Sequence, residues 1–199
     1  MQDLRTDKIK LKAIFPDKAK KYSQKYHIKS DELEFIRKGI PIEPENIEVV
    51  EGERAVISLI TTPRLDRDNE ILIPNGAVLD DFRQSPSVLW AHKYDGLPVA
   101  KDLWIKPTNK GILAKKKYAD HAFAEDVFQA IKGGFLNANS VGFIPIETVT
   151  EADGKKFSEI QEILEKEYGV PAEESSKAKN IYTKWIMLEH SDVPVPSNA

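Results

Sequence analysis

Residues 120–145 read DHAFAEDVFQAIKGGFLNANSVGFIP and combine a helix, a glycine break and a strand. Apolar side chains recur at four-residue spacing in the first half, which predicts a helix over 121–132 with Asp120 as its N-cap. The glycine pair that follows ends this helix, because glycine disfavours a helix interior. The apolar stretch 135–145 is then expected to form a strand that carries Ser140.

The sequence after residue 50 is rich in strand signals. Runs of β-branched and aromatic residues, separated by Gly, Pro, Asn and Asp, predict short strands. A second helix is expected over 156–168, because its apolar residues recur at helical spacing and Gly169 follows its end. The expected class is α+β, mainly β, with further strands at 55–62, 87–90, 97–101, 103–106, 111–118 and 181–191.

The first 50 residues are expected to flank the main fold as a basic arm and a short helix. Residues 1–25 hold eight Lys or Arg against three Asp, which is typical of a solvated surface and less often of a docking site for an anionic partner. A hydroxyl cap, then acids, bases and a glycine, predict a helix over 31–39. The main domain covers 51–199. Its insertion, about 151–180, holds the second helix and a surface loop over 172–180.

The composition excludes several classes of protein and of chemistry. With 29 Lys+Arg against 32 Asp+Glu the formal net charge is −3, which excludes a generally basic nucleic-acid coat. No apolar run approaches the roughly 18 residues of a membrane span, and the N-terminus lacks a signal-type apolar region, so we expect a soluble chain that is not exported. The absence of cysteine excludes disulfides and thiol catalysis, and no metal or cofactor site is evident. Any covalent nucleophile would be a hydroxyl.

Two positions carry residue types that suit hydrolysis. His92 lies between the apolar run 88–91 and a turn signal, so its ring is anchored by a strand yet open to solvent, as a general base requires. Ser140 precedes a glycine by two residues, and the missing side chain would let a substrate approach. Ala138 replaces the first glycine of a Gly-x-Ser-x-Gly elbow, which disfavours an α/β-hydrolase. Taken singly, each residue is better explained by a structural role.

The stretch 185–192, WIMLEHSD, supplies a third candidate. Both faces of this strand become polar near residue 189, where a carboxylate could accept the N–H of an imidazole and fix its tautomer. Solvated charges at a strand end explain the same residues. Alternation predicts one face with Trp185, Met187, Glu189 and Ser191 and the other with Ile186, Leu188, His190 and Asp192.

Together these motifs resemble the tailed-phage prohead (capsid maturation) protease family, which is related in fold to the herpesvirus assemblins. The resemblance covers roughly 55–148 and 181–199 and depends on the order of short motifs around one helix. Its parts are an Asp-rich loop (Thr61 to Glu70), a Pro, Gly, Ala, Phe stretch (Ile73 to Phe82), a histidine motif (Val88 to His92), the helix over 120–135, a nucleophile motif (Ser140 to Phe143) and a closing segment (Leu188 to Ala199).

The resemblance implies that Ser140 is the nucleophile, His92 the general base and Glu189 the residue that orients the imidazole. His190 competes with Glu189 for the third role, because the assemblin relatives use a second histidine there. His190 also stands where the prohead proteases usually have an apolar residue. The stretch 137–139 departs from the glycine-plus-apolar approach common before the family's serine, which leaves the oxyanion-hole donors open.

For fold and biology, the resemblance implies an assemblin-like antiparallel β-barrel surrounded by helices. It also implies a serine endopeptidase that cleaves phage scaffold and capsid precursor proteins, and itself, during prohead maturation. Such an enzyme acts in the host cytoplasm, inside the assembling prohead, without cofactor, nucleic acid or membrane; a homodimer or homo-oligomer is expected by analogy. The chain end at Ala199, directly after the closing segment, is expected to be a self-processed or trimmed terminus.

Two other classes of function stay open. A catalytically inactive scaffold or capsid-assembly protein of the same fold would keep the basic arm and the β core without uniting His92 and Ser140. A small β-barrel binding domain would hold both residues inside its core. The placement of the Ser140 hydroxyl relative to the His92 ring separates these alternatives.

Overall fold

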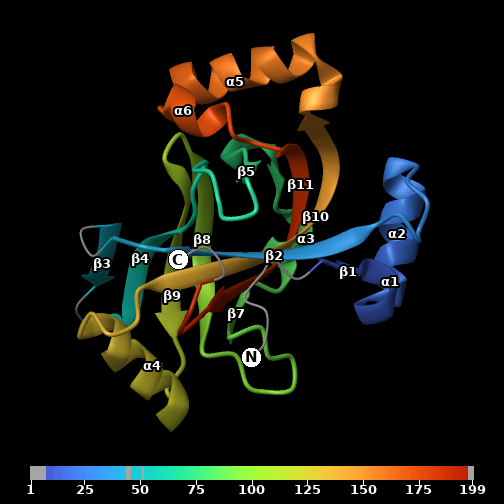
Figure 1. Cartoon of the computed structure of the whole chain (residues 1–199). Helices are drawn as coiled ribbons and strands as arrows, with labels where there is room; N and C mark the ends of the chain where they lie inside the picture. The colour runs from blue at the N-terminus through green and yellow to red at the C-terminus, as the bar shows by residue number, and fades with distance from the viewer. Residues whose placement is uncertain (1–7, 44–45, 51, 197–199) are drawn as a thin grey trace.

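The computed structural model describes residues 8–43, 46–50 and 52–196 and is a mixed α/β fold, mainly β (Figure 1). None of the helices in these ranges is long and apolar enough to cross a bilayer. The strands are β1 (Lys8–Lys10), β2 (Glu34–Pro41), β3 (Ile47–Val50), β4 (Ala55–Thr61), β5 (Glu70–Leu72), β6 (Ala77–Val78), β7 (Ser87–Trp90), β8 (Ala100–Thr108), β9 (Gly111–Tyr118), β10 (Ala138–Thr150) and β11 (Asn180–Asp192). The helices are α1 (Leu11–Ile14), α2 (Pro16–Tyr26), α3 (Asp80–Gln84), α4 (Ala122–Lys132), α5 (Lys155–Tyr168) and α6 (Ala172–Ser175), with short 3-10 turns η2 (Pro74–Gly76) and η3 (Glu151–Asp153).

One sheet joins these strands in the order β1-β2-β10-β11-β7-β8-β9-β4-β3, with β5 and β6 added to β11. Pairing is antiparallel throughout, β10 with β11 included, except that β11 runs parallel to β5, β6 and β7. Within the described residues, β1 and β3 are the two ends of the sheet and do not pair with each other. The expectation of a mainly β fold is confirmed, but the sheet is open, and the expected barrel is not confirmed. The Asn139 side chain of β10 donates to the carbonyl of Leu59 in β4 at 3.1 Å, which shows that these two strands face each other across the core.

Two apolar clusters lie on opposite faces of β10 and β11. On the inner face, Phe143, Trp185 and Met187 are fully buried in the main core. On the outer face, α1 and α2 cover Ile144 and Ile186. Figure 1 shows α4 and α5 at opposite ends of the sheet, so the middle of the outer face lies between them.

The helix predicted over 31–39 is wrong, because this segment is strand β2. It pairs with β10 through Ala138 to Phe143 and with β1. Phe35 and Ile36 are consecutive and both buried, one in the outer and one in the inner cluster, which suits a strand enclosed on both faces. Tertiary pairing therefore outweighed the local capping signals, and the sheet begins before residue 50.

Other expectations are confirmed with changed details. The strands predicted at 55–62, 87–90, 111–118 and 181–191 and both long helices are present. The two short strands between residues 97 and 106 form one strand, β8. The cap of α4 is His121, whose Nδ1 accepts the N–H of Ala124 at 3.2 Å, and not Asp120. The predicted loop over 172–180 contains α6. The predicted basic arm before residue 8 and the chain end at 197–199 lie outside the described residues.

Candidate active site

β10 and β11 bring Ser140 and Glu189 onto one face of the sheet. Residues directly opposite in an antiparallel pair share a face. Ser140 lies opposite Ser191, and Gly142 lies opposite Glu189. A β-carbon on Gly142 would collide with the side chain of Glu189, which confirms that both point outward. The serine is only 2% exposed.

A β-bulge at Leu188 gives Glu189 this orientation. Gly142 pairs with Glu189, but the next residue of β10, Phe143, pairs with Met187, so Leu188 is an extra residue in β11. Met187 faces the core with Phe143, whereas Glu189 faces outward. The alternation predicted for this strand is therefore wrong beyond the bulge, because it placed Glu189 and Met187 on the same face.

His92 reaches this face through a strained turn. Ala91 and His92 have φ values of 48° and 60°, which side chains with a β-carbon rarely adopt. Two hydrogen bonds to the end of β11 hold the turn: the N–H of Ala91 donates to the carbonyl of Asp192 at 2.9 Å, and the N–H of His92 donates to Oγ of Ser191 at 3.3 Å. Backbone strain that is fixed by surrounding bonds occurs preferentially at functional sites.

Nδ1 of His92 lies 2.5 Å from Oε1 of Glu189. An ionised carboxylate only accepts hydrogen bonds, so Nδ1 carries a proton, and in the neutral imidazole Nε2 has the free lone pair. Ser191 Oγ also lies 3.4 Å from Nδ1. This arrangement prepares the imidazole to take a proton at Nε2 while its cation is stabilised from the other side.

Two further donors hold the Glu189 carboxylate, which is 4% exposed. The Tyr94 hydroxyl donates to Oε2, and Nε of Arg37 donates to Oε1 at 3.3 Å. Burial raises the pKa of Glu189, but its hydrogen bonds and the nearby positive charge outweigh burial and hold the pKa below its ordinary value. The carboxylate therefore stays ionised at neutral pH.

The three residues implied by the resemblance converge to different degrees. His92 and Glu189 are in direct contact, and Ser140 lies on the same face, two residues along β10 from Gly142, the partner of Glu189. Within the described residues the Ser140 hydroxyl forms no hydrogen bond, either to His92 or to another group. Catalytic hydrogen bonds are often long in a free enzyme and shorten when substrate binds.

His190 lies on the opposite face, away from His92. It is fully buried, with Nδ1 2.9 Å from Oδ2 of Asp102 and Nε2 3.2 Å from Oδ1 of Asn139. The same buried group of polar side chains includes Lys116, whose Nζ donates to Asn139 at 2.8 Å. His190 is therefore part of an internal polar network, and it does not contact the candidate general base.

Sequence reasoning missed Tyr94 and Arg37. Tyr94 belongs to the turn after His92, where a tyrosine is a common surface residue. Arg37 lies in the segment that was predicted to be a helix. The only signal that could have identified it was the strand β2, which brings Arg37 opposite Gly142.

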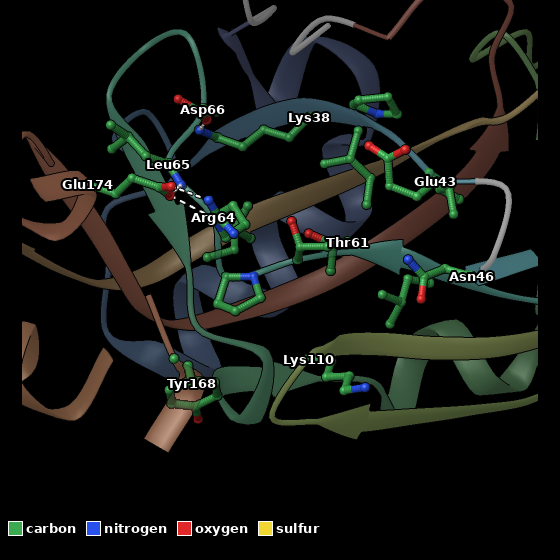
Figure 2. A pocket seen from close by; sticks show the side chains of 18 of the residues that line it. Lys38, Glu43, Asn46, Thr61, Arg64, Leu65, Asp66, Lys110, Tyr168 and Glu174 are labelled. Atoms are coloured by element: carbon green, nitrogen blue, oxygen red, sulfur yellow. Dashed lines mark hydrogen bonds and ion pairs between the residues drawn. The ribbon is translucent and has the colours of Figure 1, made fainter. Parts of the chain in front are cut away.

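A cavity of about 620 Å³ lies elsewhere, between the ends of β2 and β4 and the α5–α6 connection (Figure 2). The described residues that line it include none of the three candidates. Lys38 and Ile40 of its wall flank Gly39, the direct neighbour of Ser140 in β2. Large cavities are the usual first hypothesis for a site, but the described lining of this one holds no histidine. The outer face holds an imidazole oriented by a carboxylate, so we assign the chemistry to it.

The carboxylates of Asp66, Asp68 and Glu70 gather at the cavity wall, with one oxygen of each within 4.8 Å of the others. Lysines already pair with two of the three carboxylates, because Nζ of Lys38 contacts Asp66 and lies 2.6 Å from Glu70, and Lys8 lies 2.7 Å from Glu70. Asp66 also accepts two N–H groups of its own loop. We interpret the cluster as an ion-pair network that fixes this Asp-rich loop.

Comparison of the chain with models of known protein families, with curated proteins and with solved structures found no match. The functional interpretation therefore depends on the geometry of His92, Glu189 and Ser140 and on the motifs in the sequence.

Proposed function

We propose that the protein is a serine endopeptidase with Ser140 as nucleophile, His92 as general base and Glu189 as the residue that orients the base. The observation that carries the proposal is the 2.5 Å contact between Nδ1 of His92 and Oε1 of Glu189, on the face that holds Ser140. A base oriented by a carboxylate next to a hydroxyl is the arrangement that activates serine.

In the proposed mechanism, Nε2 of His92 takes the Ser140 proton while Oγ attacks the peptide carbonyl. The tetrahedral intermediate expels the amine, which receives that proton from His92, and an acyl-enzyme forms. Water then gives a proton to His92 and attacks the acyl carbonyl. The bond to Oγ breaks, the acid leaves, and Oγ takes the proton back from His92, so the enzyme is regenerated. Backbone N–H groups near Ser140 would stabilise the oxyanion, a contribution of about 3 kcal/mol per donor in other enzymes.

The resemblance to the prohead proteases supports a finer proposal. The substrates would be phage scaffold and capsid precursor proteins and the chain itself, cleaved in the host cytoplasm inside the assembling prohead. The assemblin-like barrel belongs to the same proposal. The approach of β10 to β4 across the core supports it, although the hydrogen-bonded sheet is open in the described residues.

Labelling with a fluorophosphonate probe tests the activity. We expect the probe to label the purified protein, Ser140→Ala to abolish labelling, and His92→Ala to lower it strongly. Ser158→Ala, at an exposed position on α5, is the matched control and should label like the wild type. A folded Ser140→Ala protein that still reacts would end the assignment. Timed mass spectrometry of the wild type and Ser140→Ala then tests self-cleavage.

The burial of Ser140 favours one alternative, an inactive assembly protein of the same fold. Ser140 is 2% exposed, and among the described residues its hydroxyl forms no hydrogen bond with His92. This alternative predicts that neither the probe nor self-cleavage identifies Ser140, while the His92–Glu189 contact persists as a structural hydrogen bond.

A further inference from the structure

The Glu189 carboxylate is held from three sides, although catalysis requires only its contact with the imidazole. His92 and Arg37 both face Oε1, while the Tyr94 hydroxyl binds Oε2. Nη2 of Arg37 also lies 3.4 Å from the Tyr94 hydroxyl, so the two donors contact each other. A carboxylate with a donor on each oxygen has a fixed plane and cannot rotate away from the ring.

Aromatic packing fixes these donors in turn. The guanidinium of Arg37 lies 5.5 Å from the ring centroid of Phe35 and 5.6 Å from that of Tyr94. Phe15, between α1 and α2, makes edge-to-face contacts with the rings of Phe35 at 5.7 Å and Tyr94 at 5.5 Å. Tyr94 is 46% exposed, so packing on Phe15 is what keeps its hydroxyl over the carboxylate.

We propose that Tyr94 and Arg37 are positioning residues for Glu189, which turn its carboxylate so that Oε1 faces Nδ1 of His92. The kinetic consequence of this proposal rests on the proposed peptidase function. The geometric consequence does not, because the hydrogen bond between the imidazole and the carboxylate is measurable without a substrate.

The first test is the proton resonance of Nδ1–H of His92 at low temperature, assigned by its absence in His92→Gln. Tyr94→Phe retains the ring and its packing but removes the donor, and Arg37→Gln removes the guanidinium. We expect a resolved low-field signal in the wild type and its broadening or loss in both variants. Tyr26→Phe and Arg64→Gln, which remove a tyrosine hydroxyl and an arginine–glutamate pair away from the site, should leave the signal unchanged.

The second test is kinetic, on a peptide that the wild type cleaves. Misplacement of the base should lower kcat about 10- to 100-fold and leave KM within about twofold, because substrate contacts are retained. Thermal unfolding shows whether Tyr94→Phe or Arg37→Gln fails to fold. If one of them does, the other variant tests the positioning proposal.

The outcomes are distinguishable. If the wild type lacks the resonance, or both folded variants retain its position and width, the positioning proposal is wrong. If the resonance behaves as expected but the probe never labels Ser140, the peptidase function is wrong and the positioning of Glu189 stands.

Discussion

Glu189 and His190 are neighbours in sequence, yet the structure gives them different chemical roles. We expect Glu189→Gln to lower kcat by roughly 10³-fold, because the amide can present the wrong partner to Nδ1 and no longer stabilises the imidazolium. The loss should be smaller than that of Ser140→Ala, which removes the nucleophile. The measurement is single-turnover peptide cleavage.

His190→Ala is the informative comparison. It opens a buried polar network and leaves Asp102 without its imidazole partner, so it should lower the free energy of unfolding while the folded fraction remains active. A His190→Ala enzyme that is fully folded but far less active than Glu189→Gln would transfer the third role to His190.

Position 142 requires glycine, because the side chain of Glu189 occupies the space that a β-carbon would need. A β-carbon at this position would lie 2.5 Å from Cζ of Phe35 and against the side chain of Glu189. Gly142→Ala should therefore displace the carboxylate, weaken labelling of Ser140 by the fluorophosphonate, and destabilise the fold by about 1–3 kcal/mol through overpacking.

Gly96→Ala is the matched control, because a β-carbon there meets nothing within 4 Å. It lies in the same loop as Tyr94 and should label at the wild-type rate. Urea unfolding measures the stability of both variants. Equal labelling by Gly142→Ala and Gly96→Ala would contradict the placement of Glu189 beside Gly142.

At the level of strands and helices, the sequence predicted the candidates but not their faces. The residue types and spacing in the sequence were enough to predict His92, Ser140 and Glu189 as candidates, and also to predict β10, β11 and α4. The bulge at Leu188 was not, because a bulge is set by how two distant strands pair and leaves no local pattern. The strand β2 was also missed, since its local signals favour a helix and only its pairing with β10 makes it extended.

The α5–α6 segment is expected to be separable from the proposed site. Thr150 and Asn180 pair directly, so an Asn-Gly turn in place of 151–179 would close the β10–β11 hairpin. Ser140 lies ten residues from Thr150, roughly 30 Å of extended chain. We therefore expect the shortened protein to retain probe labelling of Ser140.

Its stability should fall, because Phe157 and Leu164 of α5 are buried against β5 and the ends of β10 and β11. The expected decrease is about 2–5 kcal/mol, measured by urea unfolding. A shortened chain that folds cooperatively but no longer reacts with the probe would show that the insertion contributes to the site.

In the whole molecule, β10 and β11 separate two polar systems. The outer face carries the proposed triad, and the inner face carries a network in which Nζ of Lys116 lies 2.5 Å from Oδ1 of Asp192. Asp192 also accepts from the Tyr118 hydroxyl at 2.8 Å, and its backbone carbonyl accepts from Ala91 in the turn of His92. Asp192 therefore links the buried network to the turn that carries His92, and the pairing of β10 with β11 fixes the position of one relative to the other.

A third polar system, around Glu70, should dominate the acid stability of the molecule. Glu70 accepts from Lys8, Asn180 and Tyr182, and Lys38 lies beside it. Burial raises the pKa of Glu70, but Lys38, Lys8 and Asn180 outweigh burial and lower it from 4.5 to about 2. At the Lys38 ammonium, burial outweighs the attraction of Glu70 and lowers the pKa to about 8. Glu70 governs the acid behaviour, because it has hydrogen-bond donors besides Lys38.

A carboxylate with a lowered pKa in the folded state stabilises the fold fully above its ordinary pKa of 4.5, and this stabilisation is lost as pH falls toward about 2. Glu70→Gln should therefore lower the free energy of unfolding by about 3 kcal/mol at pH 6. The difference from the wild type should shrink steadily between pH 4.5 and pH 2, when urea unfolding is measured across this range. Glu162→Gln, at an exposed pair on α5, should change little at any pH. A difference for Glu70→Gln that stays constant below pH 4.5 would mean that the carboxylate is protonated or unpaired in the folded protein, and that the Asp-rich loop is held in another way.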